Sequence, residues 1–253
     1  MAEDVYPKEV WDEKFRIASY HTDPFGNLKL TSLFELFQDA AGQDAARKGF
    51  GYNELIENNR YWVLLRVKLK IYSIPHWDEG ARILTWPKDS NGITAFREFK
   101  IKNADDEDII LGTSTWTQLD TQSRRPVRIE LSDNYHPVEN MNVGLDKASK
   151  IKIPQDLNWA EHLVVKYSQI DVNHHVNNTR YLEWVLNELP FDLFKTHQFS
   201  DMEVNFLSEG KLGDVVRVGS AKVSENEWFA CVQRVGDERV LYSAKFSFDK
   251  RKD

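Results

Sequence analysis

The amino-acid sequence predicts an α+β fold of two tandem units, in each of which a long central helix is wrapped by an antiparallel β-sheet. Three observations carry this prediction: apolar side chains that alternate along several segments, two segments with helical spacing, and an internal repeat that relates those two segments. The length of 253 residues is sufficient for two small domains.

Strands are predicted where apolar side chains alternate with polar ones. Residues 61–71 alternate clearly, and a second alternation lies near the end of the chain. The buried faces are expected to carry Val63, Leu65, Val67, Leu69 and Ile71 in the first strand, and Tyr242, Ala244, Phe246 and Phe248 in the second.

Two segments follow helical spacing instead. The first covers about residues 32–47, and the capping-box spacing of Ser32 and Glu35 predicts its start. The second covers about residues 178–188, and Pro190 is expected to end it.

An internal repeat relates the two helical segments. A shift of 148 positions superimposes Asp23 on Asp171, Thr31 on Thr179 and Glu35 on Glu183. A helix wrapped by an antiparallel sheet, present twice, describes two tandem hot-dog domains. The expected boundaries are residues 1–131 for the N-terminal domain, 132–157 for a polar linker and 158–253 for the C-terminal domain.

Composition narrows the function classes. The formal net charge of −7 argues against general nucleic-acid binding, and no apolar run approaches the length of a membrane span. The single cysteine, Cys231, excludes an intramolecular disulfide and favours a reducing compartment. The N-terminal residues resemble neither a signal peptide nor a transit peptide, so a cytoplasmic location is expected.

The segment Asp171-Val-Asn-His-His-Val-Asn-Asn, which leads into the second predicted helix, resembles the signature of plant and bacterial acyl-acyl carrier protein (acyl-ACP) thioesterases. The segment Phe15-Arg-Ile-Ala-Ser-Tyr20 looks like the opening strand of that family, and Arg124-Arg125 looks like its paired arginines. The resemblance implies two tandem hot-dogs and an enzyme of fatty acid biosynthesis that hydrolyses fatty acyl-ACP to free fatty acid and holo-ACP.

Candidate catalytic residues follow from this resemblance. Asp171, Asn173 and His175 fall directly on the motif, and Glu209 matches the family's glutamate when Phe206 is used as the anchor. Gly210 stands where plant enzymes carry a cysteine. Since Cys231 lies on a later predicted strand, a cysteine–histidine mechanism is not favoured.

The expected chemistry needs a positioned base and a site for the oxyanion, with no metal or cofactor. Glu209 or His175 activates water, or Glu209 itself attacks the thioester, while Asp171 and Asn173 orient the reacting groups. Backbone N–H groups at the start of the second helix are candidate oxyanion donors. The competing interpretation is structural, because Asp and Asn before a helix often serve only as caps and turn formers.

Partners are expected to include an acidic acyl carrier protein. The arginines Arg124, Arg125 and Arg128 form one candidate docking cluster, and the lysines Lys147, Lys150 and Lys152 form another. The resemblance places the acyl chain in the N-terminal hot-dog. Two hot-dogs in one chain allow a monomer, and a homodimer remains an alternative.

Three alternatives share the predicted fold. An acyl-CoA thioesterase differs only in the carrier of the acyl group. A hot-dog dehydratase places its acid on the central helix, where Glu183 is available. A non-catalytic acyl-binding regulator needs a DNA-binding segment, and no basic helix-turn-helix pattern flanks either repeat.

Overall fold

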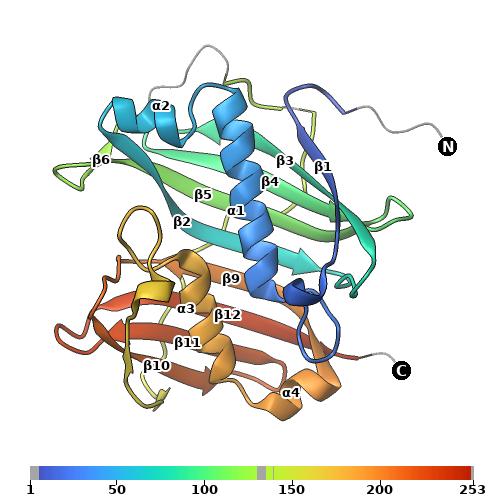
Figure 1. The fold of residues 1–253 in the computed structure, drawn as a ribbon. Coiled ribbons are helices and arrows are strands. Elements are labelled where there is room, and N and C mark those ends of the chain that lie inside the picture. Colours follow the sequence, from blue (N-terminus) through green and yellow to red (C-terminus); the bar gives the residue numbers. More distant parts are fainter. Residues whose placement is uncertain (1–5, 130–134, 139, 252–253) are drawn as a thin grey trace. The chain divides into compact units, whose positions relative to one another are not determined.

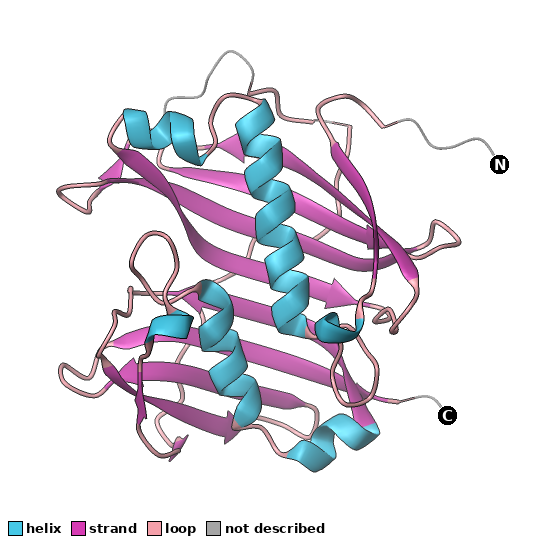
Figure 2. Cartoon of the chain, in the orientation of Figure 1, coloured by secondary structure: helices cyan, strands magenta, loops and turns pink. Residues whose placement is uncertain are grey.

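The computed structural model describes residues 6–129, 135–138 and 140–251. The chain divides into two compact units, Met1–Lys147 (unit 1) and Ala148–Asp253 (unit 2). In each unit one long helix lies across an antiparallel sheet (Figures 1 and 2). The predicted α+β class, with a helix-on-sheet arrangement present twice, is confirmed.

In unit 1 the strand order is β1-β3-β4-β5-β2, every neighbouring pair is antiparallel, and β6 pairs with β5. Helix α1 packs its apolar face on this sheet. The elements are β1 (Trp11–Arg16), η1 (Ser19–His21), α1 (Leu30–Arg47), α2 (Tyr52–Glu57), β2 (Arg60–Ile71), β3 (Gly80–Ser90), β4 (Thr94–Lys102), β5 (Asp108–Asp120) and β6 (Pro126–Val127).

In unit 2 the strand order is β9-β12-β11-β10, with the short strands β7 and β8 paired to β10. Helix α3 lies across this sheet, and α4 follows it directly in the chain (Figure 1). The elements are β7 (Asn158–Trp159), β8 (Leu163–Val164), η2 (Tyr167–Gln169), α3 (Asn178–Asn187), α4 (Phe191–Thr196), β9 (His197–Phe206), β10 (Val215–Lys222), β11 (Glu227–Arg234) and β12 (Val240–Lys250).

The start of the first helix differs from the prediction. Helix α1 begins at Leu30, and its cap is the extended backbone of Lys29 without a side-chain hydrogen bond. The predicted capping box of Ser32 and Glu35 is therefore wrong, because Ser32 lies inside the first turn and is buried. The loop before the helix fixes its start, since the Lys29 N–H donates to the carbonyl of His21 at 2.9 Å.

The predicted strand at residues 61–71 is confirmed, but its buried face changes partway along. Val67, Leu69 and Ile71 are buried as expected, whereas nearer the start Leu64 is buried in place of Leu65. A register shift between Leu64 and Arg66 in the pairing with β5 explains the change, because one extra residue moves the following side chains to the opposite face.

The internal repeat is visible in the hydrogen bonds of the loop before each long helix. In both units the carboxylate of an aspartate accepts two backbone N–H groups. The backbone N–H of the same aspartate donates to the carbonyl four residues later. In unit 1, Phe25 N and Asn27 N lie 2.8 and 2.9 Å from Asp23 Oδ1, and Asp23 N lies 2.8 Å from Asn27 O. In unit 2, Asn173 N and His175 N lie 2.8 and 3.2 Å from Asp171 Oδ1, and Asp171 N lies 2.8 Å from His175 O.

The same shift of 148 positions relates the one left-handed residue of each loop. Gly26 has φ +82° in unit 1, and His174 has φ +62° in unit 2. A left-handed residue turns the chain back toward the aspartate, so the turn is built alike in both units. The predicted duplication is thus confirmed at the level of individual hydrogen bonds.

The predicted boundary at residues 131 and 132, and residues 133, 134 and 139 of the expected linker, lie outside the described residues. Within unit 1, Val138 and Val143 are buried in a cluster with Trp86. Within unit 2, the Ile151 N–H donates to Asn205 Oδ1 at 3.0 Å. Described parts of the segment between the helix-on-sheet cores therefore pack against one unit or the other.

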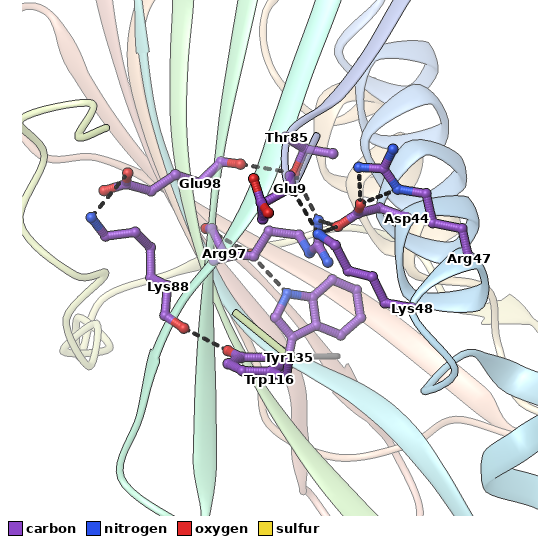
Figure 3. Close-up of polar contacts among 11 residues, drawn as sticks. Glu9, Asp44, Arg47, Lys48, Thr85, Lys88, Arg97, Glu98, Trp116 and Tyr135 are labelled. Atoms are coloured by element: carbon purple, nitrogen blue, oxygen red, sulfur yellow. Dashed lines mark hydrogen bonds and ion pairs between the residues drawn. The ribbon is translucent and has the colours of Figure 1, made fainter. Parts of the chain in front are cut away.

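A buried ion cluster lies between α1 and the sheet of unit 1 (Figure 3). The carboxylate of Asp44 is fully buried and binds three cations: Arg47 Nε at 2.9 Å, Lys48 Nζ at 2.9 Å and Arg97 Nη1 at 2.8 Å. Arg97 also donates to Thr85 Oγ1 at 3.2 Å. Charges at this depth persist only when they are paired and hydrogen-bonded, so the cluster fixes the end of α1 against β3 and β4.

Candidate active site

Two of the predicted catalytic side chains meet in unit 2. His175 Nε2 lies 3.4 Å from Glu209 Oε2, with the imidazole nearly buried and the Glu209 side chain 31% exposed. His175 comes from the loop before α3, and Glu209 comes from the loop between β9 and β10. An imidazole and a carboxylate are side chains of the kind that general acid–base catalysis uses, and here one of them is open to solvent.

The position of His175 follows from the loop described above. The Asp171 carboxylate accepts the N–H of Asn173 and the N–H of His175, so it holds both residues through their backbone. Asp171 therefore fixes the backbone of the loop that carries His175.

The position of Glu209 follows from the backbone of its neighbour. The Gly210 carbonyl accepts the N–H of Val176 at 2.9 Å, and the Gly210 N–H donates to the hydroxyl of Tyr181 at 2.8 Å. Arg234 Nη1 lies 3.5 Å from the Glu209 carbonyl. Sequence reasoning missed Tyr181, because a tyrosine on the apolar side of a helix is expected in the core.

The start of α3 supplies fewer free donors than predicted. The Asn177 side chain caps the helix and accepts the N–H of Thr179 at 2.9 Å, and the Arg180 N–H donates to the Asn177 carbonyl at 2.9 Å. The expectation of oxyanion donors at this terminus is therefore wrong for Thr179 and Arg180. Both N–H groups are already used by the cap.

The other candidate nucleophile, Cys231, and the other candidate acid, Glu183, lie away from the His175–Glu209 pair. Cys231 is fully buried on β11, and burial raises the pKa of its thiol to about 11, so the thiol stays protonated. Glu183, the acid considered for a dehydratase, is held by Arg180 Nη1 at 2.6 Å on the exposed side of α3. Neither group forms part of the His175–Glu209 pair.

Across residues 6–129, 135–138 and 140–251, no group of three or more His, Cys, Asp or Glu side chains is arranged to hold a metal ion. Within those same ranges, no helix has the length and apolar character needed to cross a bilayer.

The predicted docking arginines lie in unit 1, whereas His175 and Glu209 lie in unit 2. Arg124, Arg125 and Arg128 surround the short strand β6 and are all exposed. The guanidinium of Arg124 lies 5.4 Å from the ring centre of Tyr61. In the alternative lysine cluster, Lys147 Nζ lies 3.6 Å from Asp89 Oδ2, which offsets part of its charge.

The repeated helix-on-sheet units define a tandem hot-dog protein, and unit 2 brings an imidazole and a carboxylate together. The chain matches the acyl-ACP thioesterase N-terminal domain over residues 8–136 and the acyl-ACP thioesterase C-terminal domain over residues 154–250. The chain therefore belongs to the acyl-ACP thioesterase family.

Solved structures agree with this assignment. The crystal structure of an acyl-ACP thioesterase from Bacteroides thetaiotaomicron is 28% identical, with a TM-score of 0.89 over 95% of this chain and 98% of that chain. The 12:0-ACP thioesterase from Umbellularia californica shares the fold, with 21% identity and a TM-score of 0.85 over 98% of this chain and 100% of that chain.

A chloroplastic relative extends beyond the matched region. The oleoyl-acyl carrier protein thioesterase of Coriandrum sativum is 28% identical over 230 residues, which cover 81% of this chain and 61% of the relative. A corresponding Arabidopsis thaliana enzyme is matched over 64% of its length. The chain thus spans about three fifths of the curated plant relatives it matches.

Proposed function

We propose that this chain hydrolyses the thioester of a fatty acyl-ACP to a free fatty acid and holo-ACP, which ends fatty acid synthesis. The observation that carries the proposal is the 3.4 Å approach of His175 Nε2 to Glu209 Oε2 in unit 2. Membership of the acyl-ACP thioesterase family supports the choice of substrate.

In the proposed reaction a water molecule attacks the thioester carbonyl while Glu209 or His175 takes a proton from it. The C–S bond then breaks, and the departing thiolate receives a proton from His175. Because a thiolate is a good leaving group, the reaction needs no metal ion. A positioned acid–base group typically contributes about 10²–10⁴-fold to such a reaction.

Glu209 can also act as the nucleophile. Its carboxylate then attacks the carbonyl to form an anhydride, which water hydrolyses. Turnover in ¹⁸O-labelled water distinguishes the two routes by mass spectrometry of the protein. Label in the Glu209 carboxylate identifies the covalent route with water attacking the Glu209 carbon of the anhydride. Trapping of an acyl–Glu209 intermediate by hydroxylamine identifies the covalent route with attack at the acyl carbon, and neither signal is expected when water attacks the thioester directly.

Asp171 and Asn173 are proposed to support the pair. Asp171 holds the His175 backbone through two hydrogen bonds to the loop, and Asn173 lies in the same loop, half-buried. We assign Asp171 to positioning and Asn173 to orientation of His175 or direct contact with the thioester. These assignments place the catalytic set in the C-terminal domain.

Unit 1 is proposed to hold the acyl chain and the carrier. Burial of hydrocarbon contributes about 0.8 kcal/mol per methylene, so the apolar part of the helix–sheet layer, where Phe37 stacks on Phe99, suits selection by chain length. The exposed cluster of Arg124, Arg125 and Arg128 suits docking of an acidic carrier. We further propose that the protein is cytoplasmic and is a monomer or a homodimer. The buried, protonated thiol of Cys231 is compatible with the reducing cytoplasm.

The test measures thiol release from fatty acyl-ACP and from the matched acyl-CoA. The His175→Ala variant is expected to lose about 10²–10⁴-fold in kcat. The matched control is His174→Asn, because His174 is exposed and asparagine tolerates its left-handed backbone. Full activity of His175→Ala would refute the assignment.

The same assay separates the alternatives. Faster hydrolysis of acyl-CoA than of acyl-ACP would make the chain an acyl-CoA thioesterase. Hydration of an enoyl thioester without thiol release would indicate a dehydratase. Mass spectrometry of the fatty acids released in a bacterial host then reports the chain length.

A further inference from the structure

The proposed catalytic pair of unit 2, His175 and Glu209, lies beside two backbone groups that are hydrogen-bonded to each other. His175 directly precedes Val176, Glu209 directly precedes Gly210, and the Val176 N–H donates to the Gly210 carbonyl at 2.9 Å. The distance between the imidazole and the carboxylate therefore depends on how the Gly210 peptide is held. The Gly210 N–H is held by a side chain, the hydroxyl of Tyr181 at 2.8 Å.

The hydroxyl of Tyr181 has a fixed position. Tyr181 lies on α3 and is only 2% exposed. Its ring stacks on Tyr242 with the ring centres 5.7 Å apart and an interplanar angle of 7°, and it meets the edge of Trp184 at 5.5 Å. A ring packed on two sides transmits the position of the helix to the Glu209 loop.

Gly210 leaves space for that hydroxyl and for little else. A Cβ atom at this position would lie 2.9 Å from the Tyr181 hydroxyl and 3.0 Å from Val176 Cγ2. The glycine is therefore explained by the close approach of its neighbours.

We infer that Tyr181 is a positioning residue for the proposed reaction: its hydroxyl, by accepting the Gly210 N–H, sets the Glu209 carboxylate against His175. The inference rests on the proposed function of that pair. Misplacement of a reacting group by about 1 Å can lower a rate by about 10²-fold, so one hydrogen bond beside Glu209 is sufficient for a measurable effect.

The hydroxyl keeps its accepting role across the working pH range. Burial raises the pKa of Tyr181 well above its ordinary value, so the phenol remains neutral. Phenylalanine at position 181 keeps the ring and removes the acceptor. The Gly210 N–H then lacks its buried partner, which costs about 1–3 kcal/mol unless the loop moves toward water.

The experiment compares kcat and KM of Tyr181→Phe and Tyr242→Phe in the full chain with an acyl-ACP substrate. The two tyrosines stack on each other, and the buried Tyr242 hydroxyl has no hydrogen-bond partner among the described residues. Tyr181→Phe is expected to lower kcat about 10- to 100-fold with KM within about twofold, and to shift the pH profile of kcat/KM. Tyr242→Phe is expected to change neither.

A second pair of variants tests the same contact from the glycine side. Gly210→Ala is expected to lower kcat because the added methyl meets the hydroxyl. Tyr181→Phe combined with Gly210→Ala is expected to lose less activity than the product of the single losses, since the hydroxyl that the methyl meets is gone.

Three outcomes would overturn the inference: wild-type kcat in Tyr181→Phe, an equal loss in Tyr242→Phe, or fully multiplicative losses in the double variant. Glu209→Gln separates this inference from the proposed function. Wild-type kcat in Glu209→Gln removes Glu209 from catalysis and the positioning role with it. Loss of activity in Glu209→Gln alone, with Tyr181→Phe unaffected, rejects only the role of Tyr181.

Discussion

Residues 23–29 of unit 1 and residues 171–177 of unit 2 form the same hydrogen-bonded loop with different side chains. Phe25 of unit 1 occupies the place that Asn173 occupies in unit 2, and Asn27 occupies the place of His175. Both loops keep the aspartate that holds the backbone. The two units therefore share the backbone of this loop, and at the position of His175 only unit 2 carries an imidazole.

The strand-end loop beside it shows the same contrast. In unit 1 the Leu28 N–H donates to the Pro75 carbonyl at 2.9 Å, as Val176 donates to Gly210 in unit 2. The residue before the accepting carbonyl is Ile74 in unit 1 and Glu209 in unit 2. Unit 1 thus has asparagine and isoleucine at the two positions where unit 2 has His175 and Glu209.

The helix–sheet layers differ as well. Unit 1 buries the Asp44 ion cluster there, whereas unit 2 packs the aromatic rings of Tyr181, Phe206 and Tyr242 together. The two copies of the duplicated fold therefore have the same backbone arrangement but different side chains between helix and sheet, which allows each copy to have a different role. Variants in unit 2 are accordingly expected to change kcat, and variants in unit 1 to change stability or KM.

The largest effect is expected at the paired aspartates. Asp171→Ala removes the acceptor of two N–H groups beside His175, so kcat is expected to fall by about 10²-fold or more. Asp23→Ala removes the equivalent acceptor in unit 1 and is expected to lower the Tm while kcat stays within about threefold, because one unpaired N–H costs about 1–3 kcal/mol. Equal losses of kcat would break the comparison between the units.

The next effect concerns the stability of unit 1. Asp44→Ala leaves buried cations without their carboxylate, and the free energy of unfolding is expected to fall by about 3–5 kcal/mol. The control is Asp192→Ala, which removes an exposed ion pair with Lys195 and is expected to cost less than about 1 kcal/mol. Denaturant titration measures both, and similar losses would show that the cluster contributes little.

A smaller effect is expected from the docking cluster of unit 1. Replacing Arg124 and Arg125 by glutamine is expected to raise KM for acyl-ACP several-fold at low salt, with kcat unchanged. The effect should shrink as salt is added, because exposed charges are screened. An unchanged KM at low salt would reject this docking site, and acyl-CoA serves as the substrate control.

The smallest effect is a pH dependence of stability in unit 1. Burial raises the pKa of Glu98 above its ordinary value of 4.5, although Lys88 and the Val143 N–H favour its charged form. A carboxyl with a raised pKa in the folded state contributes stability that is present below pH 4.5 and is lost as pH rises through the raised value. Glu98→Gln removes this loss, so the variant should gain stability relative to wild type as pH rises from 4.5 through the raised pKa.

Denaturant titrations at several pH values measure that difference. The exposed residue Glu225 provides the matched control, since Glu225→Gln should follow the wild-type pH dependence. Parallel curves for wild type and Glu98→Gln would contradict the prediction.

Much of the fold and of the candidate site was predictable from the sequence, because both depend on residue types at fixed spacing. The motif at Asp171 to Asn178 made His175 and Asp171 candidates, and the single anchor Phe206 made Glu209 one; the structure brings His175 and Glu209 together. The register shift after Leu64 was not predictable, because one extra residue in a strand has no pattern of its own.

Two further features lie beyond sequence patterns because their partners are distant. Asp44 and Arg97 stand 53 positions apart, and neither gives a sign in the sequence that it is buried. Tyr181 and Gly210 stand 29 positions apart, and periodicity places a tyrosine in the core without showing where its hydroxyl points. Such contacts depend on how the helix packs against the strands and the loops between them.

The exchange of equivalent residues tests the specialisation of the two loops most directly. His175→Asn gives unit 2 the residue of unit 1, and Asn27→His makes the reverse change. With thiol release from acyl-ACP as the measurement, His175→Asn is expected to lose at least about 10²-fold in kcat, and Asn27→His is expected to keep wild-type kcat. Wild-type activity in His175→Asn, or an equal loss in Asn27→His, would contradict the account.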